Sequence, residues 1–393
     1  MENLFVFNHF ELYLIGITTL LCCIQLLYLS VTYARPLRFK RKKKNKPVDE
    51  VAFPPVSVIV YAKNESENLR KHLPVLLTQE YPEYEIIVVN DGSTDESDDI
   101  LKMLEQEHKN LYHTFTPENV KYLSRKKLAL TLGIKAAKHD ILLFTEADCL
   151  PLSPNWIASM ATNYTTETSI MLGFCAYGKY KGFLHKLIAY DNLVNGLQAI
   201  SAALSGTPYT GDGRNLSYKK ELFFANNGYQ KSLNLHAGDD DLFVNQVATK
   251  RNTRITYNPE SIMQMSKIER FNRWKEMKVS RAATQHHYKG GMLFFYRLND
   301  LFFLLFALAV FFSIYVGVTG NWLIAVFAAL LYLLRGVVKS TIFHKSAKIL
   351  QQKTVTKWLF FLDYALPAFN LYVYIYRMFR GKNDYTFRLL EGK

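Results

Sequence analysis

The segment ILLFTEADCLP, residues 141–151, begins as an apolar run and ends with two carboxylates, Glu146 and Asp148. A run this apolar is typical of a buried strand in a parallel sheet. Side chains two residues apart point to the same face of an extended chain, so Glu146 and Asp148 are expected to stand side by side. Because two ionised carboxylates repel each other, we expect a positive charge close to them.

Strands and helices alternate on the N-terminal side of this segment. Strands are predicted over residues 56–62 and 84–90, and helices over residues 67–77, 96–108 and 126–138. This alternation predicts an α/β domain with a doubly wound, mostly parallel sheet. Ligands bind beyond the C-terminal ends of strands in such sheets. Polar clusters follow three strands, at residues 63–65, 91–94 and 146–148, which predicts one shared site.

The composition favours a membrane protein. The net charge of +14 over 393 residues calls for an anionic partner, such as nucleic acid, lipid headgroups or an anionic substrate. Aromatic residues make up 14% of the chain and crowd its C-terminal third, which argues against a nucleic-acid partner. The four cysteines form no CxxC pair, so neither a zinc site nor a disulfide framework is predicted, and a reducing compartment is the simpler reading.

Residues 12–34 carry no charge and are long enough to cross a bilayer. A dense group of lysines and arginines follows within residues 35–46, and such a group marks the cytoplasmic side of a span. Glu2, Glu11 and the lack of a basic N-terminal region argue against a signal peptide. We therefore expect a transmembrane anchor with its N-terminus outside the cell.

The C-terminal quarter contains two more apolar regions. Residues 301–334 are uncharged and are broken by GVTGN at residues 317–321, which predicts a membrane hairpin at about residues 300–340. Residues 358–376 are apolar except around Asp363 and Pro367. A fourth full span would place the basic C-terminal residues outside, against the usual charge bias. A re-entrant or interfacial segment with Asp363 and Pro367 near its turn is therefore predicted.

Five segments, taken together and in this order, resemble the family 2 glycosyltransferases with a GT-A fold: VIVYAKNESENL, YEIIVVNDGSTDES, LLFTEADCLP, GDGRNLSYKK and GDDDLFVNQ. The resemblance implies transfer of a sugar from a nucleotide-diphosphate donor, a UDP- or GDP-sugar, with inversion at the anomeric carbon. It also implies a divalent metal, Mg²⁺ or Mn²⁺. The expected organisation is an anchor (1–34), a basic linker (35–53), a GT-A domain (54–290) and a C-terminal membrane region (291–393).

Four residues are assigned to the donor nucleotide by this resemblance. Asp91 matches an aspartate that accepts from a uracil-type base, and Glu65 matches an acidic position near the nucleoside. Either could instead serve a turn or a helix start. Lys126 and Lys127 match lysines near the donor, where lysine acts as a point charge for phosphate. A solvated helix face is the competing reading for both lysines.

Glu146 and Asp148 resemble the metal-binding DxD motif of the family. Asp148 is the expected direct ligand, while Glu146 replaces the usual aspartate and is long enough to reach a ribose hydroxyl or the metal. A divalent ion there would offset the charges of the two carboxylates and the diphosphate, and stabilise the leaving group. This would supply the positive charge that residues 141–151 require.

Asp239, Asp240 and Asp241 match the block in which the family places its general base. Asp240 is our choice for the base and Asp239 the alternative, because the alignment of three successive aspartates is ambiguous by one residue. An acidic cluster at a helix N-terminus is the competing interpretation. Asp241, Asn215 and Arg281 are expected on the acceptor side, with Asn215 also structuring its loop.

Processive members of the family carry a Gln-x-x-Arg-Trp block, whereas this chain has Arg273-Trp274 without the glutamine. The spans are also too few to form a roomy channel. We therefore predict an inverting, metal-dependent glycosyltransferase of the hexosyl type, in a multi-pass protein of the cell (inner) membrane. It would act on a lipid-linked or membrane-embedded acceptor at the cytoplasmic face, with residues 183–204 helping to receive a lipid. A processive polysaccharide synthase and a non-catalytic membrane scaffold with a decayed domain are the alternatives.

Overall fold

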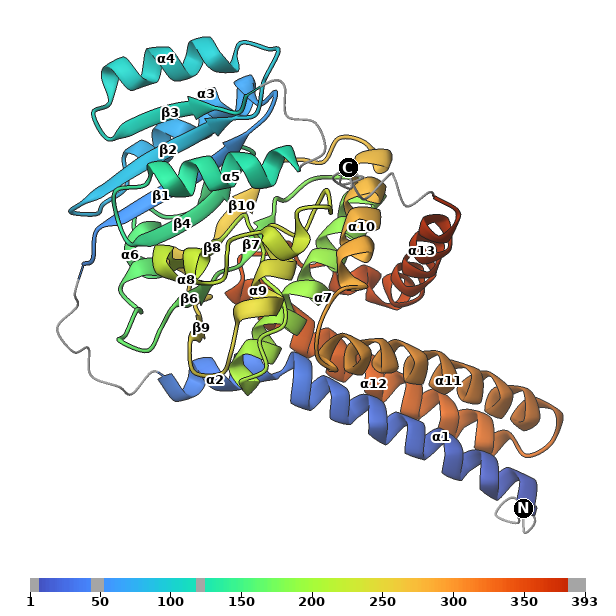
Figure 1. Cartoon of the computed structure of the whole chain (residues 1–393). Helices are drawn as coiled ribbons and strands as arrows, with labels where there is room; N and C mark the ends of the chain where they lie inside the picture. The colour runs from blue at the N-terminus through green and yellow to red at the C-terminus, as the bar shows by residue number, and fades with distance from the viewer. Residues whose placement is uncertain (1–6, 44–52, 118–123, 381–393) are drawn as a thin grey trace, which may run out of the picture.

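A computed structural model describes residues 7–43, 53–117 and 124–380, and joins an α/β domain to a group of long apolar helices (Figure 1). The main sheet has the strand order β3-β2-β1-β4-β8-β6-β9. Its strands are β1 Val56–Ala62, β2 Tyr84–Asn90, β3 Leu111–Phe115, β4 Ile141–Glu146, β6 Ile170–Leu172, β8 Leu216–Lys219 and β9 Thr253–Ile255. β1 to β4 are parallel, while β8 runs antiparallel to both β4 and β6. The mostly parallel α/β fold is therefore confirmed.

The continuous apolar runs of these strands follow from burial on both faces of the sheet. Val58 and Val60 face a core that contains residues of α3 (Ser66–Leu77) and α4 (Ser97–Glu107). Ile59, between them, faces a second core that contains residues of α5 (Arg125–Ala136). Successive side chains of a strand alternate between its faces, so most residues of β1 are apolar, and the buried hydroxyl of Ser57 donates to Glu85 (2.7 Å).

A second, small sheet of order β5-β10-β7 follows the main one. Its strands are β5 Cys149–Pro151, β7 Cys175–Tyr177 and β10 Met263–Met265. Five further helices belong to this half of the domain: α6 Trp156–Ala161, α7 Phe183–Ser205, α8 Lys220–Ala225, α9 Asp241–Val247 and α10 Phe271–Gln285. The apolar core on this side continues without interruption into the long C-terminal helices.

Four helices are long and apolar enough to cross a membrane, judged by length and composition: residues His9–Tyr33, Met292–Thr319, Trp322–Ile349 and Thr356–Phe379. The first comprises α1 (His9–Tyr28) and one π-helical turn, and it extends beside α11 (Met292–Thr319) and α12 (Trp322–Ile349) as a three-helix bundle (Figure 1). α2 (Arg35–Lys43) follows it. α11 and α12 approach closely beside their turn, because a Cβ on Gly317 would lie 2.5 Å from the backbone nitrogen of Ala325.

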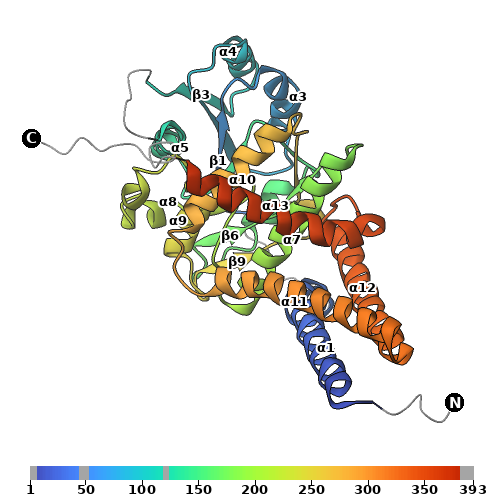
Figure 2. The same ribbon diagram turned by 90° about the vertical axis from the view of Figure 1, so that its right-hand side faces the viewer.

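The fourth helix, α13 (Leu359–Phe379), does not join this bundle. It runs across α10 and α7, and its Phe369 ring stacks on Trp274 of α10 at 4.3 Å (Figure 2). The helix continues through Asp363 and Pro367, so the predicted turn at these two residues is wrong. Helix α13 packs along α10 and α7 of the α/β domain, and its interfacial position stays a prediction.

Buried charges fasten α13 in this position. Asp363 accepts hydrogen bonds from Arg335 (2.9 Å) and Lys339 (2.5 Å) of α12, and from the hydroxyl of Tyr190 on α7 (2.5 Å). Arg335 also donates to Gln25 of α1 (3.1 Å). An isolated buried carboxylate would be costly, and these three donors compensate it.

Cysteine labelling tests whether α13 stays on the side of the α/β domain. In a Cys23→Ser background, we expect Phe379→Cys and Phe115→Cys to react alike with a membrane-impermeant maleimide in intact cells. Thr319→Cys, in the turn between α11 and α12, should behave in the opposite way. Both phenylalanines are exposed, so accessibility will depend on the membrane rather than on burial. A Phe379 position that reacts like Thr319 would mean that α13 crosses the bilayer.

Candidate active site

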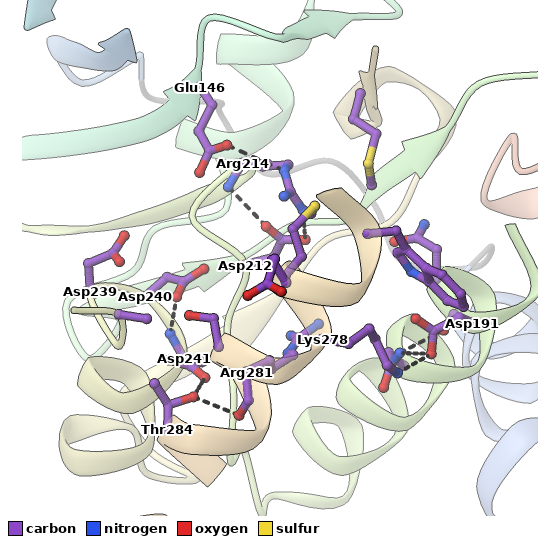
Figure 3. Close-up of a pocket in the computed structure, with 18 of the residues that line it drawn as sticks. Glu146, Asp191, Asp212, Arg214, Asp239, Asp240, Asp241, Lys278, Arg281 and Thr284 are labelled. Atoms are coloured by element: carbon purple, nitrogen blue, oxygen red, sulfur yellow. Dashed lines mark hydrogen bonds and ion pairs between the residues drawn. The ribbon is translucent and has the colours of Figure 1, made fainter. Parts of the chain in front are cut away.

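The ends of several elements meet at a cavity of about 400 Å³. Glu146 ends β4, Asp212 and Arg214 lie in the loop before β8, and Asp239 to Asp241 lead into α9. α7 and α10 close the opposite side with Asp191 and Lys278 (Figure 3). Of the three polar strand ends predicted to share one site, only the third lines this cavity, through Glu146, and the other lining residues come from parts of the chain that the strand pattern did not indicate.

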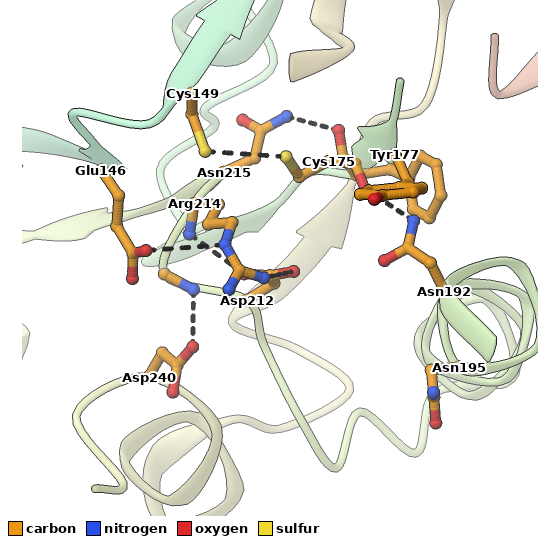
Figure 4. Close-up of polar contacts among 12 residues, drawn as sticks. Glu146, Cys149, Cys175, Tyr177, Asn192, Asn195, Asp212, Arg214, Asn215 and Asp240 are labelled. Atoms are coloured by element: carbon orange, nitrogen blue, oxygen red, sulfur yellow. Dashed lines mark hydrogen bonds and ion pairs between the residues drawn. The ribbon is translucent and has the colours of Figure 1, made fainter. Parts of the chain in front are cut away.

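Lys126 supplies the positive charge that Glu146 requires. Its ammonium lies 2.7 Å from Glu146 Oε1 and 3.1 Å from Asp239 Oδ2. Arg214 adds a second cation, with Nε 3.5 Å from Glu146 Oε2 and Nη1 3.6 Å from Asp212 Oδ2 (Figure 4). Burial alone would raise the pKa of Glu146, but Lys126 and Arg214 lower that pKa to about 2. Glu146 is therefore ionised at neutral pH.

Asp148 does not share a strand face with Glu146. β4 ends at Glu146, and Asp148 lies in the turn that leads into β5, so the expectation drawn from an extended chain is wrong. The chain turns there to leave the main sheet for the small one. Glu146 and Asp148 nevertheless line one smaller cavity together with Arg273. Burial, and next the charge of Glu146, raise the pKa of Asp148.

Arg273 of α10 connects Asp148 with Glu65. Its Nη2 lies 3.7 Å from Asp148 Oδ2 and 3.7 Å from Glu65 Oε1. Glu65 also accepts from Asn68, and burial raises its pKa. Glu65 therefore lies close to Asp148, as an acidic residue of the same site.

The two carboxylates fit an open divalent-metal site. Among the described residues, no group of three or more histidine, cysteine, aspartate or glutamate side chains could hold a metal ion. Mg²⁺ is commonly held by one or two carboxylates together with substrate phosphates, and needs no complete protein cage. Asp148 and Glu146 on one cavity wall satisfy this smaller requirement.

The three successive aspartates take different positions. Asp239 is buried against Lys126, while Asp240 is half-buried and caps α9. Asp240 accepts from the backbone N–H of Asp241 (2.6 Å) and of Gly213 (2.7 Å). Asp241 Oδ2 accepts instead from Thr284 (2.5 Å) and Tyr288 (2.8 Å). The helix-cap interpretation is therefore correct for Asp240, and it leaves this carboxylate on the cavity wall.

Lys127 points away from the cavity. Its ammonium is buried and donates to the backbone carbonyls of Leu235 (3.1 Å) and Ala237 (2.7 Å), and also to that of Ser232. Burial lowers its pKa to about 8. The predicted contact with the donor is therefore wrong for Lys127, which holds the loop that precedes Asp239.

Asp91 lies at the end of β2, as predicted, and is buried. Tyr61 (2.8 Å), Thr116 (2.7 Å) and Arg125 (2.9 Å) all donate to its carboxylate. Gly92 adopts φ +63°, and a Cβ there would lie 2.8 Å from Arg125 Nη2, so glycine suits this turn. Recognition of a base by Asp91 stays a prediction.

Asn215 and Arg281 were both expected on the acceptor side. Asn215 is fully buried: it accepts from Trp156 (3.1 Å) and donates to the carbonyls of Phe174 (2.9 Å) and Ser261 (2.7 Å). Its acceptor role is therefore wrong, and it fixes the loop instead. Arg281 does line the cavity.

Sequence reasoning did not assign four of the residues on the cavity wall: Asp212, Arg214, and the ion pair of Lys278 with Asp191, in which Nζ lies 2.7 Å from Oδ1. Asp212 and Arg214 stand in the quoted segment GDGRNLSYKK, where only Asn215 was singled out. An aspartate and an arginine two residues apart in this segment could have indicated that both belong to the acidic site. Asp191 lies in the mainly apolar α7, and a charged residue on a buried helix could have indicated a paired or functional group.

Comparisons with known proteins show which family the α/β domain resembles. Residues 57–223 match the family model described as Glycosyl transferase family 2. A poly-beta-1,6-N-acetyl-D-glucosamine synthase of Staphylococcus epidermidis is 33% identical over 93 residues, which are 24% of this chain and 21% of that protein. A dolichyl N-acetyl-alpha-D-glucosaminyl phosphate 3-beta-D-2,3-diacetamido-2,3-dideoxy-beta-D-glucuronosyltransferase of Methanococcus voltae is 27% identical over 182 residues, 44% of this chain and 50% of that protein. The chain thus aligns with half or less of either relative.

The fold is also found among solved structures. The mannosyltransferase PcManGT from Pyrobaculum calidifontis, in complex with GDP-Man and Mn2+, superimposes with a TM-score of 0.58 at 18% sequence identity. The superposition covers 93% of this chain and 99% of that one. It confirms the GT-A type of the α/β fold.

The buried Asp241 predicts a pH-dependent stability. Burial, with Asp240 acting in the same direction, raises its pKa from 3.8 to about 6. Between these values the folded chain binds a proton that the unfolded chain has released, so the free energy of unfolding falls as pH rises. Asp241→Asn keeps an acceptor for Thr284 and Tyr288 without titrating. Melting temperatures from about pH 4 to 6 should fall less steeply for this variant than for the parent; equal slopes would contradict the assignment.

Proposed function

Because residues 57–223 match the family model described as Glycosyl transferase family 2, we propose that the protein moves a sugar from a nucleotide-diphosphate donor to a lipid-linked or membrane-embedded acceptor, with inversion at the anomeric carbon. The observation that carries the proposal is one acidic site fixed by two cations. Glu146, Asp239 and Asp240 line the same cavity, and Lys126 and Arg214 hold its charges in place.

On the donor side, Asp148 and Glu146 would hold a divalent ion, Mg²⁺ or Mn²⁺, which when bound offsets the charge of the leaving diphosphate. Lys126 and Arg214 lie beside Glu146 at that position. Their role is to keep Glu146 ionised and oriented, and Arg273 does the same for Asp148 and Glu65.

On the acceptor side, Asp240 would take the proton from the acceptor hydroxyl as its oxygen attacks the anomeric carbon. The bond from that carbon to the diphosphate breaks on the opposite face, which gives inversion. Two backbone N–H groups fix the Asp240 carboxylate, so its geometry is set before the acceptor arrives. Its other lone pairs face a cavity that is open to a substrate.

A lipid acceptor is supported by the position of the cavity and by one relative. α7 and α10 line the cavity, and both also contact α13, beside the three-helix bundle. The Methanococcus voltae relative carries a dolichyl phosphate sugar in its name. The basic residues 35–46 after the first span favour a cytoplasmic site in the cell (inner) membrane.

A processive polysaccharide synthase is the second candidate, because the Staphylococcus epidermidis relative is one by its name. Trp274 lines the cavity although the glutamine of the processive block is missing. Product length separates the two candidates.

The direct test is a donor panel. The purified full chain, with a total membrane lipid extract as acceptor, is incubated with radiolabelled UDP- and GDP-sugars in Mn²⁺. We expect label from one donor to move into the organic phase as a product with one added sugar. A ladder of products would favour the synthase, and no transfer or hydrolysis of any donor would contradict both candidates.

Asp148→Ala should abolish transfer and weaken Mn²⁺ binding in the presence of UDP or GDP, because half of the proposed carboxylate pair is lost. Mn²⁺ binding is measured by electron paramagnetic resonance. Asp99→Ala removes an exposed carboxylate far from the cavity and is the matched control. Unchanged Mn²⁺ binding, or full activity in excess chelator, would refute the metal site.

Asp240→Asn should reduce turnover by roughly 10²- to 10⁴-fold, the usual cost of losing an acid–base group, with nearly unchanged donor affinity. Asparagine still offers an oxygen to cap α9. Asp239→Asn measured beside it tests the alternative base. Normal turnover of both variants at saturating acceptor would make the aspartate cluster structural.

A further inference from the structure

A second cavity, of about 410 Å³, lies on the membrane side of the first. It is bounded by α7, α10, α11, α12 and α13, and α11 and α12 belong to the three-helix bundle. The two cavities share the lining residues Asp191, Asn195, Lys278 and Arg281. A ligand in the second cavity would therefore contact side chains that also line the acidic site.

The charges of the two cavities have opposite signs. The first is lined by seven acidic and four basic side chains, whereas the second is lined by five basic and three acidic ones. The second also contains apolar walls from Val194, Leu293, Phe303, Leu366 and Leu371. A basic, partly apolar cavity fits an amphiphile with an anionic head.

Most basic groups of the second cavity already have partners. Lys278 pairs with Asp191, and Arg335 and Lys339 pair with Asp363. Two arginines of the second cavity, Arg281 and Arg297, form no ion pair with a carboxylate in the described part of the chain. Arg297 is exposed and donates to Gln285 (3.4 Å), whereas Arg281 is half-buried, and Asp212 and Asp241 act on it from further away. Arg281 stands on α10 (Figure 3), and it lines both cavities. Five rigid N–H donors and a permanent charge make such an arginine well suited to a phosphate.

Resting on the proposed function, we propose that the acceptor is a phosphorylated lipid, whose phosphate is bound by Arg281 at this junction and whose chain lies in the second cavity between α11 and α13. Lys278, one turn before Arg281 on α10, stands beside the same junction. The proposal accounts for a basic cavity placed between an acidic reaction site and the membrane helices.

The test measures binding without donor, using the full chain purified in detergent. Farnesyl monophosphate is the probe, with farnesol and inorganic phosphate as its two halves. We expect farnesyl monophosphate to raise the melting temperature and to bind at least about tenfold tighter than either half, because charge-assisted and apolar contacts act together. Equal binding of farnesol would overturn the phosphate site, and equal binding of inorganic phosphate would overturn the lipid chain.

Arg281→Gln should weaken farnesyl monophosphate binding by about tenfold or more, since it removes the charge of the guanidinium. Arg270→Gln, which removes an exposed arginine at the start of the same helix, should leave binding within about twofold. Should Arg281→Gln not fold, Gln285→Glu replaces it, because it places a carboxylate in the second cavity, one turn from Arg281 and beside Arg297, and so lowers the positive charge offered to a phosphate. Unchanged affinity in the folded variant overturns the proposal.

The binding experiment tests this inference separately from the proposed function. Binding requires neither donor nor turnover, so a chain that binds farnesyl monophosphate yet transfers no sugar contradicts the proposed function alone. Sugar transfer to an unphosphorylated lipid, with no binding of farnesyl monophosphate, contradicts this inference alone.

Discussion

The ammonium of Lys126, held between Glu146 and Asp239, is the interaction on which the site depends. Glu146 ends a strand of the sheet and Asp239 precedes α9, so one cation joins two parts of the chain that are far apart in sequence. Burial disfavours the charged lysine, but Asp239 and Glu146 raise its pKa above the ordinary value. Removing one member of such a buried group leaves the others uncompensated and typically costs about 3–5 kcal/mol.

Lys127, the next residue, helps to position Asp239 for its contact with Lys126. Lys126 and Lys127 both stand in the first turn of α5, where the helix dipole disfavours cations. Each therefore needs strong acceptors: Lys126 has two carboxylates, and Lys127 has the backbone carbonyls of the loop before Asp239. Lys127 thus positions the carboxylate that its neighbour binds. The two lysines are adjacent in the sequence but have different roles: Lys126 balances the charge of two carboxylates, and Lys127 supports the loop.

The sequence predicted the sheet well because burial on both faces leaves an unambiguous signal. The strands at residues 56–62 and 84–90 were predicted with their observed bounds, and Glu146 at the end of β4 lines the cavity. The sequence-based prediction was wrong at two positions where a turn or a side-chain contact decides which way a residue points. The turn after Glu146 moves Asp148 off the strand, and Asn215 is consumed by three buried partners that lie far away in the sequence. Such contacts depend on tertiary packing, which neither spacing nor propensity encodes.

A series of buried polar contacts also links the cavity to the three-helix bundle. Gln25 of α1 contacts Arg335, which pairs with Asp363 of α13, and Asp363 also binds Tyr190 of α7. The neighbouring residue, Asp191, pairs with Lys278 on the cavity wall. Each contact is a buried hydrogen bond or ion pair, and breaking it would leave a buried polar or charged group without a partner, which destabilises the fold. A tilt of the bundle relative to the α/β domain would therefore strain polar contacts as well as apolar packing, so the cavity and the bundle are held at a fixed distance from each other.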